Sequence, residues 1–408
     1  MHEKRNQRDI IDRVIQMKKF LIVMFSVLIA LTGCAKNQGS PEHDATPRQV
    51  VDRNGQPGNE PISSRGRVLP DERGENELNL KGKTKRIESI GFLEATSPDR
   101  AVEDALEAVR DLTYVAFFSY QVRPDGSLIP LKDEKPLQAI QNKAVPMLVL
   151  TNFAEGNFQP DLAHQIFTNR QSLNRLMNQV EQVMKEKGYK AINIDFEHIY
   201  EKDRELYHGF LETFVPRMKK HGYVVSTALA PKSSDEQAGA WHGAHDYAFH
   251  GKIADFVILM TYEWGWTGGP PMAVAPLPQV RKVVDYAVQK IPPEKIVMGA
   301  PLYGYDWTLP YKKGGPPAKR IAPHEAETFA KKRGLKVEYN NRDEAPYFYY
   351  RDEQGKKHVI WYENEQSMQA KHNLIKEYGL RGVSYWVLGE DFPENWKLLR
   401  QNFKINKY

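Results

Sequence analysis

Two carboxylates spaced two residues apart dominate the chemistry that this chain could perform. Residues 191–198 run Ala-Ile-Asn-Ile-Asp-Phe-Glu-His and include Asp195 and Glu197. In a strand, successive side chains point to opposite faces, so Asn193, Asp195 and Glu197 would share one face and three apolar residues the other. An isolated Asp-x-Glu is more often a solvated strand edge. Inside a fold, however, an unpaired carboxylate carries a large desolvation cost, and general acid catalysis is one reason to keep it there.

Strand-like segments alternate with helix-like segments after residue 85, which predicts a parallel sheet. Eight such units over residues 86–408 fit a closed (β/α)8 TIM barrel, an α/β fold whose catalytic groups lie at the C-terminal ends of the strands. Glu197 would lie near such an end. The eight predicted strands span residues 86–95, 112–122, 145–153, 191–198, 223–230, 256–263, 295–303 and 382–388.

One connection is longer than the others and predicts a small α+β insertion between the seventh and eighth strands. It falls within residues 308–380, an interval that begins with a Pro-Gly-rich segment at 310–317. We expect it to form one wall of a groove. It contains a helix-like segment at 323–333 and strand-like segments at 336–339, 347–351 and 358–361.

Residues 17–34 predict export. Met17 is followed by two lysines, a short apolar run and the ending Leu-Thr-Gly-Cys34, which is typical of a signal peptide with a lipobox. Met17 would then be the true start, and Cys34 would carry the lipid of an extracytoplasmic, membrane-anchored lipoprotein. An uncleaved membrane anchor is the alternative. Cys34 is the single cysteine, so the exported part has no disulfide.

Residues 35–85 are polar and rich in Gly and Pro, and predict a flexible linker. The net charge of +5, with acidic and basic residues interspersed, does not indicate a nucleic acid partner. A cluster of three histidines and one aspartate matches no zinc signature, so we expect a solvated helix or loop and no metal. We expect a monomer. The cluster consists of His242, His245, Asp246 and His250.

Three segments together resemble glycoside hydrolase family 18, the chitinase-like hydrolases. Residues 190–197 resemble the D-x-x-D-x-D-x-E signature, residues 260–263 resemble M-x-Y-D on the sixth strand, and Ser384-Tyr385-Trp386 resembles the eighth-strand tryptophan motif. The resemblance spans residues 86–403. Residues 263–271, 299–305 and 385–389 further resemble a spore-type branch that includes cortex-lytic N-acetylglucosaminidases.

The chain departs from the family pattern at three positions. Lys190 and Asn193 stand where the signature has its first two aspartates, and Glu263 stands where the sixth-strand motif has Asp. Asn at the second position is common in the spore-type branch. Glu263 carries a longer side chain than Asp beside the expected sugar.

The resemblance implies a retaining mechanism in which the 2-acetamido group of the substrate acts as the nucleophile, an exception to the two-carboxylate scheme. Glu197 would be the acid and later the base, Asp195 would orient the acetamido group and raise the pKa of Glu197, and Tyr262 would hold the acetamido carbonyl. No cofactor is implied. The predicted substrate-binding residues are Trp386, Asn193, Met260, Glu263, Tyr303 and Trp264, and further aromatic residues that could stack on sugars are Trp266, Tyr305 and Trp307.

These implications predict a β-N-acetylglucosaminidase that acts on a glycan containing N-acetylglucosamine, most naturally the peptidoglycan of the spore cortex. Two alternatives remain within the family: a hydrolase of chitin or chito-oligosaccharides, and a chitinase-like lectin that binds without cleavage. A third hypothesis is a sporulation or germination scaffold whose barrel only docks a partner. The presence of Asp195, Glu197 and Tyr262 together favours the enzyme.

Overall fold

The computed structural model describes residues 84–95, 97–237, 239 and 241–408. The predicted signal peptide, the lipidation residue Cys34 and nearly all of the predicted linker lie outside the described residues, so these stay predictions. Within the described ranges, no helix is long and apolar enough to cross a membrane.

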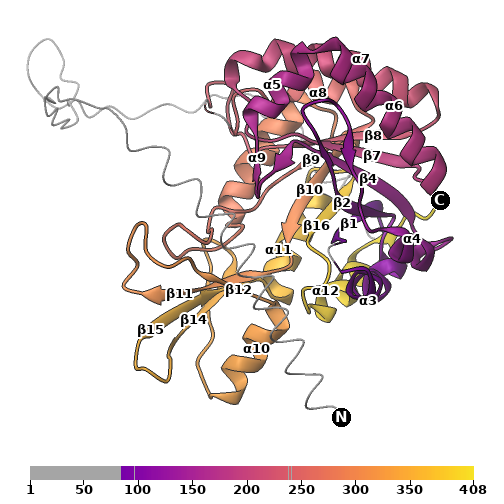
Figure 1. Ribbon diagram of the computed structural model, residues 1–408. Helices are drawn as coiled ribbons and strands as arrows, with labels where there is room; N and C mark the ends of the chain where they lie inside the picture. The colour runs from indigo at the N-terminus through magenta and orange to yellow at the C-terminus, as the bar shows by residue number, and fades with distance from the viewer. Residues whose placement is uncertain (1–83, 96, 238, 240) are drawn as a thin grey trace, which may run out of the picture. The chain divides into compact units, whose positions relative to one another are not determined.

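Eight parallel strands close into a barrel, which confirms the predicted fold class (Figure 1). Closure follows from β1, which pairs with β2 on one side and with β16 on the other. Every neighbouring pair around the ring is parallel. In order around the ring, the strands are β1 (Arg86–Glu94), β2 (Tyr114–Val122), β4 (Val145–Thr151), β7 (Ala191–Asp195), β8 (Val224–Leu229), β9 (Phe256–Leu259), β10 (Ile296–Pro301) and β16 (Gly382–Trp386).

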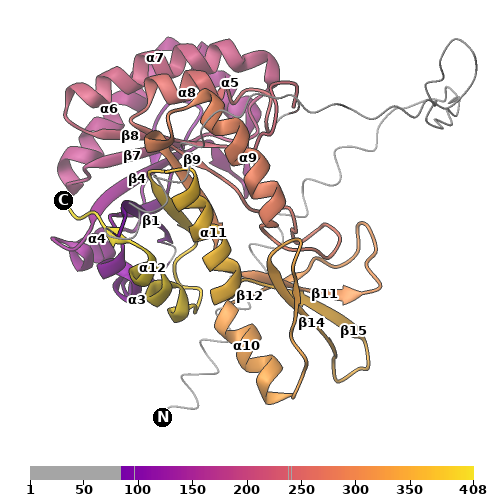
Figure 2. The same ribbon diagram turned by 180° about the vertical axis from the view of Figure 1, so that it is seen from behind.

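Helices connect the strands and cover the outside of the barrel, as Figure 2 shows from the opposite side. The sequence sets their ends: Asn169 caps α6 by accepting hydrogen bonds from the main-chain N–H groups of Gln171 and Ser172, and Gly188 ends it with a φ of 76°. The barrel helices are α3 (Pro98–Ala108), α4 (Glu134–Ile140), α5 (Pro160–Thr168), α6 (Arg170–Lys187), α7 (Arg204–Lys220), α8 (Tyr247–Ile253), α9 (Leu277–Lys290), α11 (Glu365–Glu377) and α12 (Pro393–Asn402).

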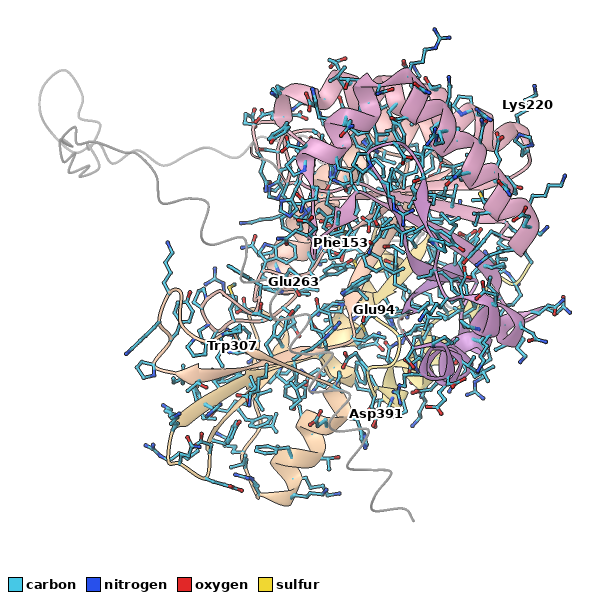
Figure 3. All side chains as sticks on the ribbon, viewed as in Figure 1. Glu94, Phe153, Lys220, Glu263, Trp307 and Asp391 are labelled. Carbon is cyan, nitrogen blue, oxygen red and sulfur yellow. The ribbon has the colours of Figure 1, made fainter. Side chains whose placement is uncertain are left out.

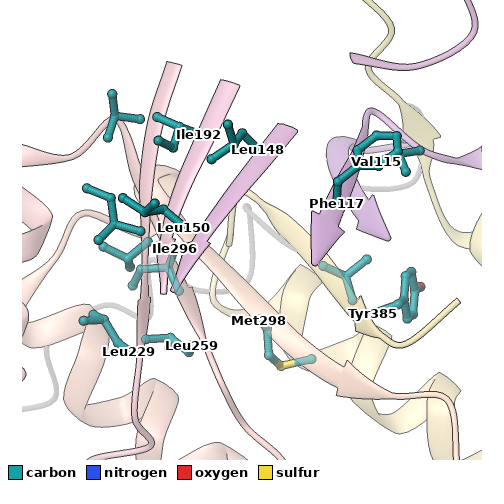
Figure 4. Close-up of a cluster of buried hydrophobic side chains, with 14 of the residues drawn as sticks. Val115, Phe117, Leu148, Leu150, Ile192, Leu229, Leu259, Ile296, Met298 and Tyr385 are labelled. Carbon is teal, nitrogen blue, oxygen red and sulfur yellow. The ribbon is translucent and has the colours of Figure 1, made fainter. Parts of the chain in front are cut away.

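Strand residues sort alternately into two buried clusters. Leu148 and Leu150 of β4 point outward into the layer between strands and helices, part of which is drawn in Figure 4. Met147 and Val149 of the same strand belong to a second cluster that fills the barrel interior. This two-residue period fixes which side of each strand faces the interior. It therefore also decides which polar side chains enter the barrel.

The α+β insertion between the seventh and eighth barrel strands is confirmed. Its sheet is antiparallel in the order β12-β11-β15-β14-β13, and α10 packs on one face of it. Residues 365–377, inside the predicted 308–380 range, instead form the barrel helix α11, which packs into the main core. The insertion contains β11 (Gly304–Leu309), β12 (Lys319–Ile321), α10 (Pro323–Lys332), β13 (Glu338–Asn340), β14 (Ala345–Arg351) and β15 (Lys357–Trp361).

The other face of the insertion sheet packs against the connection between β9 and α9. Trp307 donates its indole N–H to the carbonyl of Gly269 at 2.9 Å, and Tyr311 donates its hydroxyl to the carbonyl of Gly268 at 2.9 Å. The insertion is thereby anchored to the barrel beside the sixth-strand motif. The remaining short strands are β3 (Leu128–Ile129), β5 (Phe153–Ala154), β6 (Asn157–Phe158) and β17 (Lys404–Ile405).

Candidate active site

Asn193 and Asp195 lie inside the barrel because they share the inward phase of β7 with Ala191 of the interior cluster. Asn193 is fully buried, and its Oδ1 accepts a hydrogen bond from the hydroxyl of Ser226 on β8 at 3.0 Å. Asp195 is 5% exposed, and within the described residues its Oδ1 has no hydrogen-bond partner. A buried acceptor without a partner is costly unless a ligand supplies the donor.

Glu197 lies beyond the end of its strand. The predicted strand 191–198 is too long, since β7 ends at Asp195. Trp241, in the connection between β8 and α8, donates its indole N–H to Oε2 of Glu197 at 2.7 Å. The carboxyl group of Glu197 is therefore held by Trp241, a residue that was not predicted from the sequence to be part of the site.

Burial and mutual repulsion govern the charges of the two carboxylates. Burial raises the pKa of Asp195 above its usual range. Burial raises the pKa of Glu197 well above its ordinary value; the negative charges of Asp195 and Glu263 raise it further, whereas the hydrogen bond from Trp241 lowers it. Glu197 thus keeps its proton at pH values where an exposed glutamic acid loses it, which suits a general acid.

Tyr262 follows β9 and is half-buried, and its ring packs on both the main core and the cluster beneath the insertion. Burial, with the nearby charges of Asp195 and Glu197, raises the pKa of its hydroxyl well above the usual range. A Cβ at Gly299 would lie 2.9 Å from the Tyr262 ring, so only glycine at 299 leaves the ring in this position. Tyr262 therefore presents a neutral hydroxyl beside the two carboxylates.

Glu263 contacts the protein itself. One of its carboxylate oxygens accepts hydrogen bonds from the hydroxyls of Tyr303 and Tyr305. The guanidinium of Arg320, from β12 of the insertion, lies 4.3 Å from the centre of the Tyr303 ring. Burial raises the pKa of Glu263. Glu263 and Tyr303 were both predicted to bind substrate, but their contacts here join the barrel to the insertion.

Trp386 lies at the end of β16, among aromatic residues from other strands. The centres of its ring and the Phe118 ring are 4.9 Å apart with an interplanar angle of 80°, and its ring lies 5.6 Å from that of Phe92. Phe153 packs edge-on against Phe118. Trp386 remains half-buried, so part of its ring is accessible to a ligand. In Figure 3, Phe153 of the barrel and Trp307 of the insertion are labelled on either side of Glu263.

The remaining predicted residues differ in accessibility. Met260 is 5% exposed, so little of its side chain is accessible to a ligand. Trp264 lines a cavity of about 380 Å³ together with Pro231, Ser234 and Gln237, which keeps it accessible to a ligand. Trp266 is 39% exposed, whereas Tyr305 and Trp307 are buried, so the prediction that these two stack on sugars is wrong.

Two of the three histidines in the cluster are not solvated, contrary to the prediction, whereas His242 and Asp246 are half-buried. His245 and His250 are buried, and each binds protein atoms. His245 contacts the main chain of Ala230 and Phe196, and His250 contacts the hydroxyl of Thr227. His245 therefore supports the site, because it binds the main-chain carbonyl of the residue before Glu197.

Three comparisons place the chain among known proteins. Residues 91–391 match the family described as glycosyl hydrolases family 18. The cortical fragment-lytic enzymes of Bacillus cereus and Bacillus subtilis are 43% and 42% identical to the chain, over 80% and 79% of its length and 77% and 75% of theirs. The crystal structure of the Bacillus cereus spore cortex-lytic enzyme SleL superposes with a TM-score of 0.77 at 41% identity, covering 80% of this chain and 76% of that one. The chain therefore belongs to glycoside hydrolase family 18 and is a glycoside hydrolase.

Proposed function

We propose that the chain hydrolyses β-linked N-acetylglucosamine in the peptidoglycan of the spore cortex or its fragments. The pair of Asp195, which is buried, and Glu197, which is half-buried, carries the proposal. Glu197 is kept protonated, and within the described residues an oxygen of Asp195 has no hydrogen-bond partner. Two close relatives are named as cortical fragment-lytic enzymes, which supports cortex as the source of the glycan.

The reaction begins with substrate assistance. The carbonyl oxygen of the 2-acetamido group attacks the anomeric carbon, the glycosidic bond breaks, and the proton of Glu197 passes to the leaving oxygen. Oδ1 of Asp195 accepts the acetamido N–H, and the hydroxyl of Tyr262 donates to the acetamido carbonyl oxygen. Asp195 then stabilises the positive charge of the resulting oxazolinium ring.

Water completes the cycle. The Glu197 carboxylate takes a proton from a water molecule, whose oxygen attacks the anomeric carbon and opens the oxazolinium ring. One linkage is hydrolysed, the anomeric configuration is retained, and Glu197 is again protonated. A substrate without a 2-acetamido group at the cleaved sugar, such as cellulose or starch, is not hydrolysed.

We also propose that the enzyme works outside the cytoplasm as a monomer, anchored to a membrane by lipid on Cys34. The basic and apolar residues before the Leu-Thr-Gly-Cys sequence support the anchor, and the polar stretch that follows it would give the barrel reach.

The test is incubation of the purified protein with spore-cortex fragments, vegetative peptidoglycan and chitin oligomers, followed by mass spectrometry of new reducing ends. We expect products ending in N-acetylglucosamine from cortex. The Glu197→Gln variant is the matched control and should bind the same glycans without cleaving them. Cleavage of chitin oligomers alone would make the enzyme a chitinase, and binding without cleavage by the wild type would indicate a lectin.

A further inference from the structure

The main chain around Glu197 is held by two side chains from neighbouring strand connections. The peptide group that joins Phe196 to Glu197 has its N–H bound by Asn152 at 2.9 Å and its C=O bound by His245 at 3.1 Å. The carbonyl of Glu197 accepts a second hydrogen bond from Asn152 at 2.8 Å. Three main-chain polar groups beside the acid's Cα therefore have side-chain partners.

Asn152 continues the sheet where its regular pairing stops. The ladder between β4 and β7 ends at the pair Thr151 and Asp195. One residue further on, the fully buried amide of Asn152 accepts the N–H of Glu197 through Oδ1 and donates to its carbonyl through Nδ2. Because a carboxamide has the same donor and acceptor as a peptide group, Asn152 supplies the missing pair of ladder bonds. Asn152 itself is fixed by Gln159, whose carbonyl also accepts from Nδ2 at 3.0 Å.

His245 holds the carbonyl side of the Phe196–Glu197 peptide group, and its ring does so in a single tautomer. Its Nδ1 lies 2.8 Å from the main-chain nitrogen of Ala230, which can only donate, so Nδ1 must accept. The proton of the neutral ring is then on Nε2 and donates to the Phe196 carbonyl. The ring is 1% exposed. A protonated ring would place a second donor against the N–H of Ala230, so the neutral form alone satisfies both contacts.

The backbone after the acid needs such support. His198 follows Glu197 directly and has a φ of 54°, a left-handed conformation that residues with a side chain seldom adopt. Without fixed hydrogen bonds on the preceding peptide, the chain could relax toward ordinary extended geometry and turn the Glu197 side chain away from Asp195.

We propose that Asn152 and His245 are positioning residues for catalysis, which hold the Phe196–Glu197 peptide and so fix where the acid's carboxyl group lies. The inference rests on the proposed function of Glu197 as the acid. Neither residue bonds the carboxyl group itself, so their effect passes through the backbone.

Matched variants of the full chain test the proposal. Asn152→Leu and His245→Phe keep side-chain size and remove the hydrogen bonds, whereas His245→Gln offers an acceptor and a donor spaced like the two ring nitrogens. On the cleaved glycan we expect kcat to fall on the order of 100-fold in the first two variants, with KM little changed, since small misplacements of a catalytic group have effects of that size. His245→Gln should recover most of the loss. Asn152→Ser, which shortens the side chain and adds no charge, is the replacement variant if Asn152→Leu fails to fold.

A second readout does not need turnover. The indole N–H of Trp241 donates to Glu197, so its NMR signal, assigned with a Trp241→Phe variant, should shift as pH titrates that carboxyl group. We expect this response in the wild type and its loss in folded Asn152→Leu and His245→Phe proteins. Folded variants that keep both the wild-type kcat and the indole response would overturn the positioning roles. Absence of hydrolysis by the wild type would instead refute the proposed function. The pH response of the indole signal would still test whether Asn152 and His245 position Glu197.

Discussion

Replacing Asp195 with asparagine tests whether the charge of that residue keeps the catalytic acid protonated. Asp195 and Glu197 are two residues apart, and two residues of extended chain span at most about 7 Å. Two charges at that distance, at an effective dielectric constant of about 20, interact by about 2 kcal/mol. Because the interaction raises the pKa of Glu197, its removal should lower that pKa. The rate needs protonated Glu197, so the alkaline limb of kcat/KM should move to lower pH.

The same substitution should reduce kcat by at least 100-fold or so, because the acetamido group loses a charged partner. The assay is kcat/KM against pH on a soluble glycan, which reports the pKa values of the free enzyme. Thermal stability is the control. Burial raises the folded-state pKa of Asp195, so its favourable contribution to stability is present at low pH and is lost as pH rises through that pKa. The variant should therefore melt at the same temperature as the wild type or higher at neutral pH. An alkaline limb that stays in place or moves to higher pH would refute the electrostatic reasoning.

Three further substitutions give distinct outcomes. Trp241→Phe removes the indole hydrogen bond that lowers the pKa of the acid, so the alkaline limb of kcat/KM should move to higher pH. The rate should fall by about tenfold, which is the value of one such hydrogen bond. A shift of the alkaline limb to lower pH, as in the aspartate variant, would contradict this. Gly299→Ala places a Cβ 2.5 Å from a main-chain oxygen and 2.9 Å from the Tyr262 ring. The variant should lose about 1–3 kcal/mol of unfolding free energy in chemical denaturation, and its kcat should fall. An unchanged denaturation midpoint would show that the Tyr262 ring is not confined. Lys371→Met leaves Glu363 buried without its ion pair, whose atoms lie 2.8 Å apart. The variant should lose about 3–5 kcal/mol of unfolding free energy at neutral pH. Adding Glu363→Gln should restore most of that stability.

The barrel could be predicted from the sequence because its signals are local. Alternation of strand-like and helix-like segments needs only the period of the apolar residues, and each of the eight predicted barrel strands overlaps an observed one. The same two-residue period predicted that Asn193 and Asp195 share a face. Boundaries were less accurate, since a strand ends where its neighbour stops pairing: β7 stops at Asp195, and residues 365–377 return to the barrel as α11.

Contacts between segments that are far apart in the sequence could not be predicted from it. Trp241 lies 44 residues from Glu197, and Asn152 lies 45 residues before it. Nothing local marks either residue as part of the site. Glu263 and Tyr303 share a hydrogen bond only because the strands that precede them are neighbours in the closed ring and the insertion folds back over both.

The sequence by itself determined the fold class, the family resemblance and the carboxylate pair, because each depends on residue types at short spacing. The tertiary structure alone decided how deeply that pair is buried and which side chains support it. A pKa depends on burial and on charges gathered from several strands, and the hydrogen bonds that hold Glu197 come from the connections after β4 and β8. Ring closure brings these groups within hydrogen-bond distance, and that closure is a property of the whole barrel.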